Sequence, residues 1–398
     1  MIRAFKYRLH PNSSQATVLE SWLSQCCEIY NAALEQRIVA YKFHGRLMTK
    51  YEQQVQLTEL RASDPAWRAV PALVQRSALE RLDRAFVGFF ARCKAGKTKA
   101  GFPRFRLPHR YDAFAIHKGA WTEKSPLFQK GRLHIPKLGH IKLNLYRPIA
   151  GKILCVTIWR DGIGKWWTSV ACDVGDAPPK APAVRALVGI DLGLTALATL
   201  STGETISNPR YAKRSEDQLA HRQRALARKQ KGSKNREKAR KLVAKPHAHV
   251  ANQRLDYARK EVKKLFERFD AVAYEDLSVA ALSRSLLSKS FHDASWGVLL
   301  RCLTSKAEEA GKYAVPVDHR ETSQLCSSCG RVVHKDLSER VHRCICGLTI
   351  DRDHNSAITV CARGRRALEM LNVSVDGEVS WKDETKPFLP ILETAVRF

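Results

Sequence analysis

The feature that most restricts how this chain can fold is a group of four cysteines within 21 residues. They form two short knuckles, each followed by glycine: CSSCG at 326–330 and CICG at 344–347. Cysteine pairs of this kind are typical of zinc ribbons, in which four thiolates close a tetrahedral structural site. The second pair has one intervening residue rather than two, which leaves His342 open as a substitute ligand. The preferred prediction is a zinc ribbon over residues 321–349, with the ligands Cys326, Cys329, Cys344 and Cys346.

The chain also carries a large excess of positive charge. Its 398 residues contain 68 Lys and Arg against 39 Asp and Glu, a net charge of +29. This exceeds what solubility needs and predicts a polyanionic partner, of which nucleic acid is the commonest. No run of about 18 apolar residues is present, so no membrane partner is expected. The start of the chain has no apolar leader and the other seven cysteines are scattered, which favours a reduced, cytoplasmic protein.

The first part of the chain shows both helical and strand patterns. Basic and apolar residues alternate over 2–9, which predicts a half-exposed strand. Apolar residues at helical spacing predict three helices, over about 14–44, 50–62 and 71–93. Short segments separated by Gly and Pro over 110–174 predict a small β-barrel or sandwich.

A Pro-rich linker at 175–183 separates this part from the rest. After it, residues 186–204 read as two apolar strands joined by a tight turn, in which Gly193 takes part. Another buried strand is predicted within 269–279, then a helix around 296–312. A last helix begins within DRDHN at 351–355. The sequence is therefore expected to form an α+β protein of several domains.

Two basic stretches are candidates for contact with nucleic acid. The loop at 94–106 interleaves Lys and Arg with Phe, a combination that can pair with phosphates and stack on bases. Residues 210–268 hold 20 Lys or Arg against 6 acidic residues in a helical pattern, whereas solvated helices usually mix the two signs. A solvated loop and a solvated helix are the alternatives. The predicted contacts are Lys6, Arg8, Arg104, Arg106, Lys231, Lys234, Arg236, Lys238 and Arg254.

Three acidic residues stand at the ends of apolar segments. Asp191 closes the strand VGID, Glu275 closes the strand VAYE, and Asp353 begins the last helix. A carboxylate at the end of a buried strand needs a partner, and ligands that are all oxygen suit Mg²⁺ or Mn²⁺. Two such ions about 3.5–4 Å apart can activate water and stabilise the leaving oxygen in phosphodiester cleavage. The three acids are therefore predicted to be metal ligands and catalytic residues.

An ordered series of motifs resembles one protein family. They are FKYRLHPN near the N-terminus, GFPRFR at 101–106, GIDLG at 189–193, KGSKNR at 231–236, HAHVANQRLD at 247–256, YEDL at 274–277, SWG at 295–297, TSQLCSSCG at 322–330 and CGLTIDRDHNSA at 346–357. Their order and spacing resemble TnpB, the RNA-guided nuclease family encoded by bacterial transposons and related to compact type V CRISPR effectors. The resemblance covers nearly the whole chain except the C-terminal tail.

The resemblance implies an arrangement of domains. It would consist of a β-barrel wedge domain (1–12 and 108–182), an inserted helical recognition domain (13–107), an RNase H-like RuvC domain (183–320) with a mixed sheet and helices, the zinc ribbon (321–349), a C-terminal RuvC segment (350–372) and a peripheral tail (373–398). It also implies that Asp191, Glu275 and Asp353 form the catalytic triad, which leaves Asp351 as the weaker candidate. The family carries DRDxNAA where this chain has DRDHNSA, a small departure.

The resemblance further implies the activity. A guide RNA would pair with target DNA beside a short duplex motif that the protein reads, and the RuvC site would cut the DNA. Expected cofactors are Mg²⁺ or Mn²⁺, Zn²⁺ and guide RNA, with double-stranded DNA as target. One chain per RNA is expected, and a dimer stays open. A nuclease-inactive, RNA-guided repressor is the main alternative, but such derivatives lose triad carboxylates and this chain has all three. A zinc-ribbon RNA-binding protein without guide function would not need them.

Overall fold

The computed structural model describes residues 1–96, 99–117, 127–277, 290, 293–336 and 339–376. The chain divides into two units, Met1–Asp176 and Ala177–Phe398. The boundary falls within the Pro-rich linker predicted at 175–183. Each unit has a hydrophobic core made from its own residues.

An antiparallel sheet of seven strands frames the first unit, in the order β2-β6-β7-β1-β5-β4-β3. The strands are β1 (Ile2–His10), β2 (Ala113–His117), β3 (Phe128–Gln129), β4 (Arg132–Ile135), β5 (Gly139–Asn144), β6 (Lys152–Arg160) and β7 (Trp166–Asp173). The alternation in β1 buries Phe5, Tyr7 and Leu9 on one face, as predicted for the N-terminal strand. Within the described residues the edge strands β2 and β3 do not pair with each other, so the sheet is a half-barrel.

Helices cover the buried face of this sheet. They are α1 (Ser13–His44), α2 (Lys50–Ser63), α3 (Pro65–Arg68), α4 (Ala72–Lys94) and the short 3-10 helix Pro108–Arg110. The three helices predicted from apolar spacing are confirmed to within two residues at each end. Trp22 of α1 lies edge-on to Phe114 of β2, with ring centroids 6.0 Å apart. The helical segment expected over 13–107 therefore shares one core with the sheet, because a sheet's apolar face must be covered.

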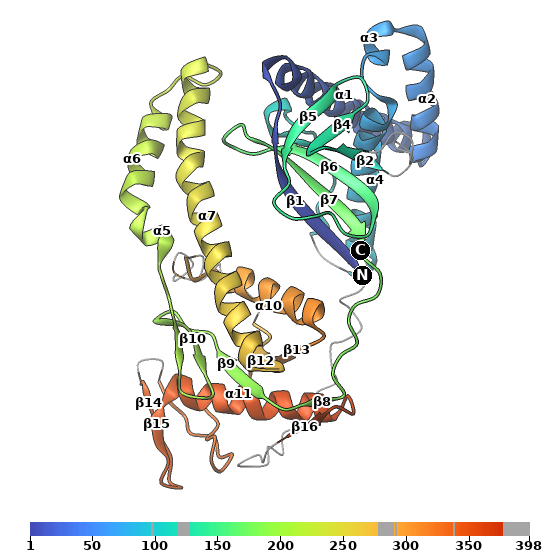
Figure 1. Cartoon of the computed structure of the whole chain (residues 1–398). Coiled ribbons are helices and arrows are strands. Elements are labelled where there is room, and N and C mark those ends of the chain that lie inside the picture. Colours follow the sequence, from blue (N-terminus) through green and yellow to red (C-terminus); the bar gives the residue numbers. More distant parts are fainter. Residues whose placement is uncertain (97–98, 118–126, 278–289, 291–292, 337–338, 377–398) are drawn as a thin grey trace. The chain divides into compact units, whose positions relative to one another are not determined.

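A mixed sheet of five strands lies at the centre of the second unit, in the order β11-β10-β9-β12-β13 (Figure 1). The strands are β9 (Leu187–Asp191), β10 (Ala196–Leu200), β11 (Thr205–Ser207), β12 (Ala271–Glu275) and β13 (Tyr313–Val317). The predicted pair after the linker is antiparallel, β9 with β10. Strand β12 is parallel to both β9 and β13. Because β9 and β12 are parallel neighbours, their carboxyl ends meet at one edge of the sheet.

The two faces of this sheet bury different helices. On one face, α7 (Lys234–Arg268) and α10 (Trp296–Ala310) pack around Val188, Ile190 and Val272. On the other, α11 (Arg352–Glu369) packs around Ala271, Ala273 and Val315. The sheet is thus the middle of three layers, and α11 crosses it over β9 and β12 (Figure 1).

Glycines bring α11 unusually close to the sheet. A Cβ added to Gly189 of β9 would lie 2.2 Å from the carbonyl oxygen of Ala357 in α11. A Cβ added to Gly364 of α11 would lie 2.3 Å from the Cβ of Ala273 in β12. Only residues without a side chain fit at these two positions.

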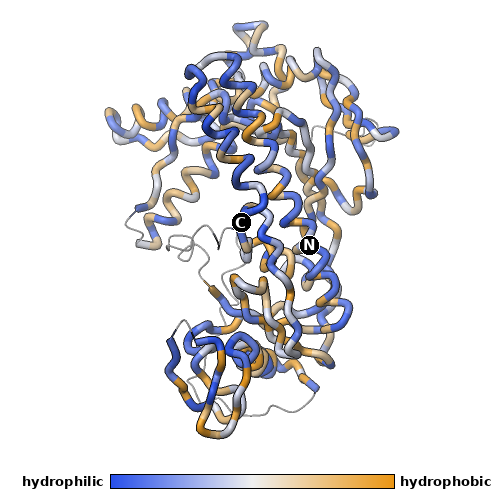
Figure 2. The backbone as a smooth tube through the Cα atoms, turned by 90° about the vertical axis from the view of Figure 1, so that its left-hand side faces the viewer, coloured by the Kyte–Doolittle hydropathy of each residue, from blue (hydrophilic) through white to orange (hydrophobic). Residues whose placement is uncertain are grey.

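The basic stretch 210–268 is helical, as predicted. It forms α5 (Tyr211–Arg214), α6 (Glu216–Ala227) and α7, and α6 lies alongside α7 (Figure 1). Hydrophilic residues predominate along α7, as the blue colouring of Figure 2 indicates. None of the helices in the described part of the chain is long and apolar enough to cross a membrane.

The cysteine segment and the chain's end complete the second unit. Strands β14 (Val341–Arg343) and β15 (Thr349–Asp351) form a small antiparallel pair before α11. Strand β16 (Ser374–Val375) pairs with β8 (Ala183–Val184), and the side chains of Val373 and Val375 pack against the core. The tail expected to be peripheral from residue 373 therefore begins later, because these two valines bury apolar surface. Residues 377–398 lie outside the described part.

Candidate nuclease centre and cysteine cluster

Asp191 is the last residue of β9. The hydroxyl of Ser356 in α11 donates a hydrogen bond of 3.0 Å to its Oδ1. Burial of the carboxyl group, together with the nearby charges of Glu275 and Asp353, raises the pKa of Asp191 to about 8, although the Ser356 hydrogen bond and the charge of Arg352 act to lower it. A carboxyl group in this setting resists ionisation unless a cation compensates its charge.

Glu275 is the last residue of β12, the parallel neighbour of β9. Its side chain is buried, with 6% of the residue exposed. Thr322 Oγ1 donates to Glu275 Oε1 over 2.5 Å. Burial raises the pKa of Glu275, and the charge of Asp353 adds to the rise. Glu275 and Asp191 therefore meet at the same edge of the sheet, as their positions at strand ends led us to expect.

Asp353 and Asp351 have different places in the structure. Asp353 is the second residue of α11, and its Oδ1 lies 3.4 Å from Nε of Arg352. Its charge acts on both Asp191 and Glu275. Asp351 is the N-cap of α11: its Oδ1 accepts from the backbone N–H groups of Asp353 and His354, at 2.9 and 3.1 Å. Asp351 thus caps the N-terminus of α11, while the charge of Asp353 acts on the carboxyl groups of Asp191 and Glu275.

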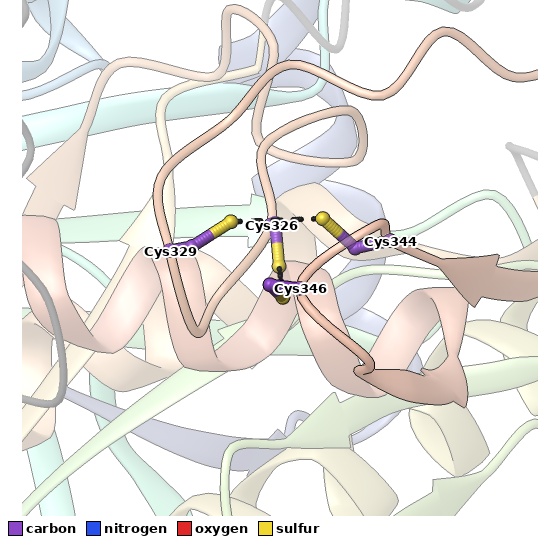
Figure 3. A group of neighbouring side chains, drawn as sticks. All are labelled: Cys326, Cys329, Cys344 and Cys346. Carbon is purple, nitrogen blue, oxygen red and sulfur yellow. Dashed lines mark hydrogen bonds between the residues drawn. The ribbon is translucent and has the colours of Figure 1, made fainter.

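The four cysteines come together in space. Their sulfur atoms all lie within 4.8 Å of one another (Figure 3). The pairs Cys326–Cys346 and Cys329–Cys344 each have sulfurs 3.6 Å apart. Four ligands at the usual Zn–S distance would have sulfurs about 3.8 Å apart. The backbone N–H of Leu348, together with the side chains of the other three cysteines, lowers the pKa of Cys346 to about 7, which favours the thiolate that a metal requires.

His342, the alternative ligand, is not part of this sulfur cluster. It is fully buried in β14, and its Nδ1 contacts Nζ of Lys335. The four-cysteine set is the one whose donor atoms converge.

The predicted nucleic-acid contacts fall into two groups. Lys6, Arg104, Arg106, Lys231, Lys234 and Lys238 are exposed. By contrast, Arg8 is half-buried, and its NH1 donates to the Trp166 carbonyl at 3.1 Å. NH1 of Arg236 donates to the carbonyls of Leu226 and Lys229, at 3.1 and 2.7 Å. Arg254 forms an ion pair of 2.9 Å with Asp293. The guanidinium groups of Arg8, Arg236 and Arg254 are therefore engaged in the fold itself.

Three residues at the site were missing from the predicted set. Ser356 and Thr322 hold the carboxylates of Asp191 and Glu275. The fully buried Asn355 accepts from Ser327 N at 2.9 Å and donates to the Leu325 carbonyl at 2.7 Å. All three lie inside the motifs TSQLCSSCG and DRDHNSA, so the signal was present. Their side chains are uncharged, which is why a search for acids and cysteines passes over them.

Three family models match parts of the chain. A family model described as "Probable transposase", for the OrfB proteins of IS605 elements, matches residues 169–286. A "Cas12f1-like, TNB domain" model matches 296–360, which includes the cysteine cluster. A model described as "Helix-turn-helix domain" matches 1–46, where the structure has strand β1 followed by the single long helix α1.

Two relatives match along almost the whole chain. A Streptomyces pristinaespiralis protein is 34% identical over 92% of this chain and 90% of its own length, and its name provisionally assigns an RNA-guided DNA endonuclease. InsQ of Escherichia coli (strain K12), with the same provisional assignment, is 28% identical over 92% of this chain and 93% of its own length.

A solved structure shares the fold. The Cas12f1 chain, in a cryo-EM structure with sgRNA and target DNA, aligns with a TM-score of 0.56 at 15% identity, over 88% of this chain and 83% of that one. The motifs and the long match to relatives lead to one conclusion. The chain belongs to the TnpB (OrfB) family and is an RNA-guided DNA endonuclease.

Proposed function

We propose that Asp191, Glu275 and Asp353 hold two divalent cations, Mg²⁺ or Mn²⁺, and form the site at which target DNA is cut. The observation that supports this most is their proximity: Asp191 and Glu275 end neighbouring parallel strands, burial raises the pKa of both, and the charge of Asp353 adds to both rises. Their donors are all oxygen, which suits hard cations. Bound ions of this kind activate the attacking water and stabilise the leaving oxygen in phosphodiester hydrolysis.

The chain's own residues would prepare this site. Ser356 and Thr322 each donate to one oxygen of a carboxylate and so fix its orientation. The N-terminus of α11 holds Asp353 at the edge where β9 and β12 end. Because the three carboxylates repel one another without a cation, they should bind divalent ions more strongly as the pH rises.

We further propose that the cysteine cluster binds one Zn²⁺ and is structural. Four sulfurs enclose the position, which leaves none of the tetrahedral sites for a substrate. We also propose that the wedge and recognition functions reside in the sheet and helices of the first unit, and that one chain binds one guide RNA.

Phosphate contacts are proposed for the exposed basic side chains. Lys231, Lys234 and Lys238 lie at the end of the α6–α7 hairpin, and Arg104 and Arg106 lie in the basic loop. Lys6 lies on the sheet of the first unit. Arg8, Arg236 and Arg254 are left out of this set because their guanidinium groups have partners within the fold.

The test is guided cleavage of a target plasmid in Mg²⁺ by the protein–guide RNA complex. Asp191→Ala, Glu275→Ala and Asp353→Ala should each abolish cutting while guide RNA binding and target binding persist. Asp276→Asn is the matched control, since Asp276 is the exposed neighbour of Glu275. Full-rate cleavage by any of the three alanine variants would remove that residue from the centre.

A further inference from the structure

We infer that Thr322 and Asn355 are positioning residues which make the cysteine knuckle a structural part of the nuclease centre. This inference rests on the proposed metal site. It goes beyond it by assigning a role to two uncharged side chains and to the turn that connects them.

The first step is the contact between Thr322 and Glu275. Thr322 lies in the turn between β13 and the first cysteine knuckle and is 4% exposed. Its Oγ1 is 2.5 Å from Glu275 Oε1 and 3.0 Å from the carbonyl oxygen of His319. A hydroxyl carries one proton, so it donates to Glu275 whenever that carboxylate is charged. The bond fixes the rotation of the carboxylate and so directs its other oxygen, Oε2.

The second step connects this turn to the cysteines. The N–H of Leu325 donates to the carbonyl of Glu321, and the N–H of Cys326 donates to the carbonyl of Arg331, both at 2.9 Å. Thr322 therefore belongs to the same folded loop as the ligand Cys326. If the knuckle loosens, the hydroxyl that orients Glu275 loosens with it.

The third step connects the knuckle to α11. Asn355 uses both ends of its amide on the knuckle: it accepts from Ser327 N and donates to the Leu325 carbonyl. Asn355 is two residues from Asp353, and the next residue, Ser356, donates to Asp191. Hydrogen bonds and short stretches of backbone thus connect Glu275 through the knuckle to α11 and on to Asp191. Each of the three acids is held directly, or through its own helix, by this set.

The fold offers no other support of this kind for Glu275 in the described residues, where the hydrogen bond to its side chain comes from Thr322. Groups that orient metal ligands from behind commonly change metal affinity or activity by about 10–100-fold when removed. We expect an effect of this size from Thr322→Val, which keeps the shape and removes the hydroxyl.

The experiment compares Thr322→Val, Thr322→Ser and Thr359→Val in the full chain with guide RNA. Thr359 is the matched control: it is a buried threonine of α11 whose hydroxyl donates to the backbone carbonyl of Asn355 and contacts no carboxylate. Three quantities are measured: the Mn²⁺ affinity by titration, the single-turnover cleavage rate against metal concentration, and the zinc content. Thr322→Val should bind Mn²⁺ and cleave about 10–100-fold more weakly with its zinc and RNA affinity unchanged. Thr322→Ser should restore both values, and Thr359→Val should match the wild type.

A second variant tests the other half of the connection. Asn355→Asp keeps an oxygen to accept from Ser327 N but loses the donor to the Leu325 carbonyl. Amide hydrogen exchange should then become faster over residues 322–331 while zinc remains bound, and cleavage should fall. Wild-type exchange in this segment, with undiminished cleavage, would contradict the role of Asn355.

The outcomes separate this inference from the proposed function. If Asp191→Ala is inactive while Thr322→Val binds Mn²⁺ and cleaves like the wild type, the positioning role is overturned and the metal site stands. If the wild type itself binds no Mn²⁺ with guide RNA present, the proposed site fails and the inference fails with it. If Thr322→Val loses its zinc, the hydroxyl is needed for the fold of the knuckle rather than for the carboxylate, which also overturns the role.

Discussion

At the scale of single residues, the fold disfavours ionisation of the Asp191 carboxyl group in the nuclease centre. Burial and two neighbouring acids raise the pKa of Asp191 from its ordinary 3.8 to about 8. In the metal-free protein, the folded state therefore holds a proton that the unfolded chain releases between these values. Because the folded state binds more protons, the contribution of this group to the free energy of unfolding falls as the pH rises from about 4 to 8.

Asp191→Asn should remove this effect. In EDTA at pH 8 the variant should melt above the wild type, by at least the 2–4 °C that roughly 1 kcal/mol produces in a unit of about 150–250 residues. The difference should shrink as the pH falls and disappear below about pH 3, where the carboxyl is neutral in both states. Mg²⁺ should raise the melting temperature of the wild type only. Equal melting temperatures in EDTA at pH 8 would contradict the shifted pKa.

The two aspartates at the start of α11 should also separate in experiment. Asp351→Ala removes an N-cap that accepts two backbone hydrogen bonds, which should cost about 1 kcal/mol of stability and reduce cleavage only severalfold. Asp351→Asn keeps an accepting oxygen and should behave like the wild type. Asp353→Ala should abolish cleavage with little loss of stability. Thermal melts paired with cleavage assays would show the contrast, and complete inactivity of Asp351→Ala would reverse the assignment.

At the scale of elements, the α6–α7 hairpin combines side chains that hold it together with side chains that face solvent. Arg236 donates to carbonyls at the end of α6 and in the turn after it, and Arg222 donates to the Leu242 carbonyl at 2.9 Å. For the exposed side chains of Lys231, Lys234 and Lys238, the structure shows no hydrogen bond to a carbonyl of the hairpin. The charge of the hairpin is therefore only partly available to a partner.

Changing Lys231, Lys234 and Lys238 to Ala should weaken guide RNA binding whatever the guide sequence. Removal of each lysine–phosphate interaction should lower the salt slope of binding by about 0.7–0.9, because fewer counterions are released. Circular dichroism should be unchanged. Arg236→Ala should instead reduce the helical signal. A titration at several salt concentrations measures the slope, and an unchanged slope and affinity in the triple variant would mean a solvated hairpin.

The cysteine cluster allows a prediction about metal content. Purified protein should contain about one zinc per chain, the number that one closed site holds. Cys344→Ser should lose the zinc and destabilise the start of α11, because metal binding there is also folding free energy. Cys93→Ser, at an exposed cysteine outside the cluster, should keep it. Elemental analysis decides, and a folded, active wild type without zinc would refute the site.

At the scale of the whole molecule, the first unit has a core that needs no residue beyond Val174. A fragment of residues 1–176 should therefore fold alone and melt in one cooperative transition. Leu143→Ala, which removes a 5% exposed core side chain from β5, should lower its melting temperature. A fragment that shows no cooperative transition would mean that this unit depends on the second one.

Much of this architecture was predictable from the sequence because its signals are local. The apolar spacing in α1 and α4, the alternation in β1, and the apolar runs ending in Asp191 and Glu275 can all be read within about ten residues of chain. Strand partners could not be predicted in this way. That β1 lies between β7 and β5, or that β9 and β12 are parallel neighbours, depends on contacts between residues far apart in sequence.

The same limit applies to the site. The three acids and four cysteines are chemically conspicuous, so residue type and spacing suffice to select them. Ser356, Thr322 and Asn355 gain their roles only when the loop and the helix meet. Arg236 shows the converse: in sequence it is one more cation in KGSKNR, and in the structure its guanidinium closes a turn.

Gly189 and Gly364 have no functional group, but they affect the geometry of the nuclease centre. The gap between α11 and the sheet is set by what these two positions lack, and that gap fixes how far Asp353 lies from the acids at the ends of β9 and β12. A methyl group at either position would push α11 away from the sheet. The distance of Asp353 from Asp191 and Glu275 therefore depends partly on the absence of a side chain at these two glycines, a feature that a list of reactive residues does not include.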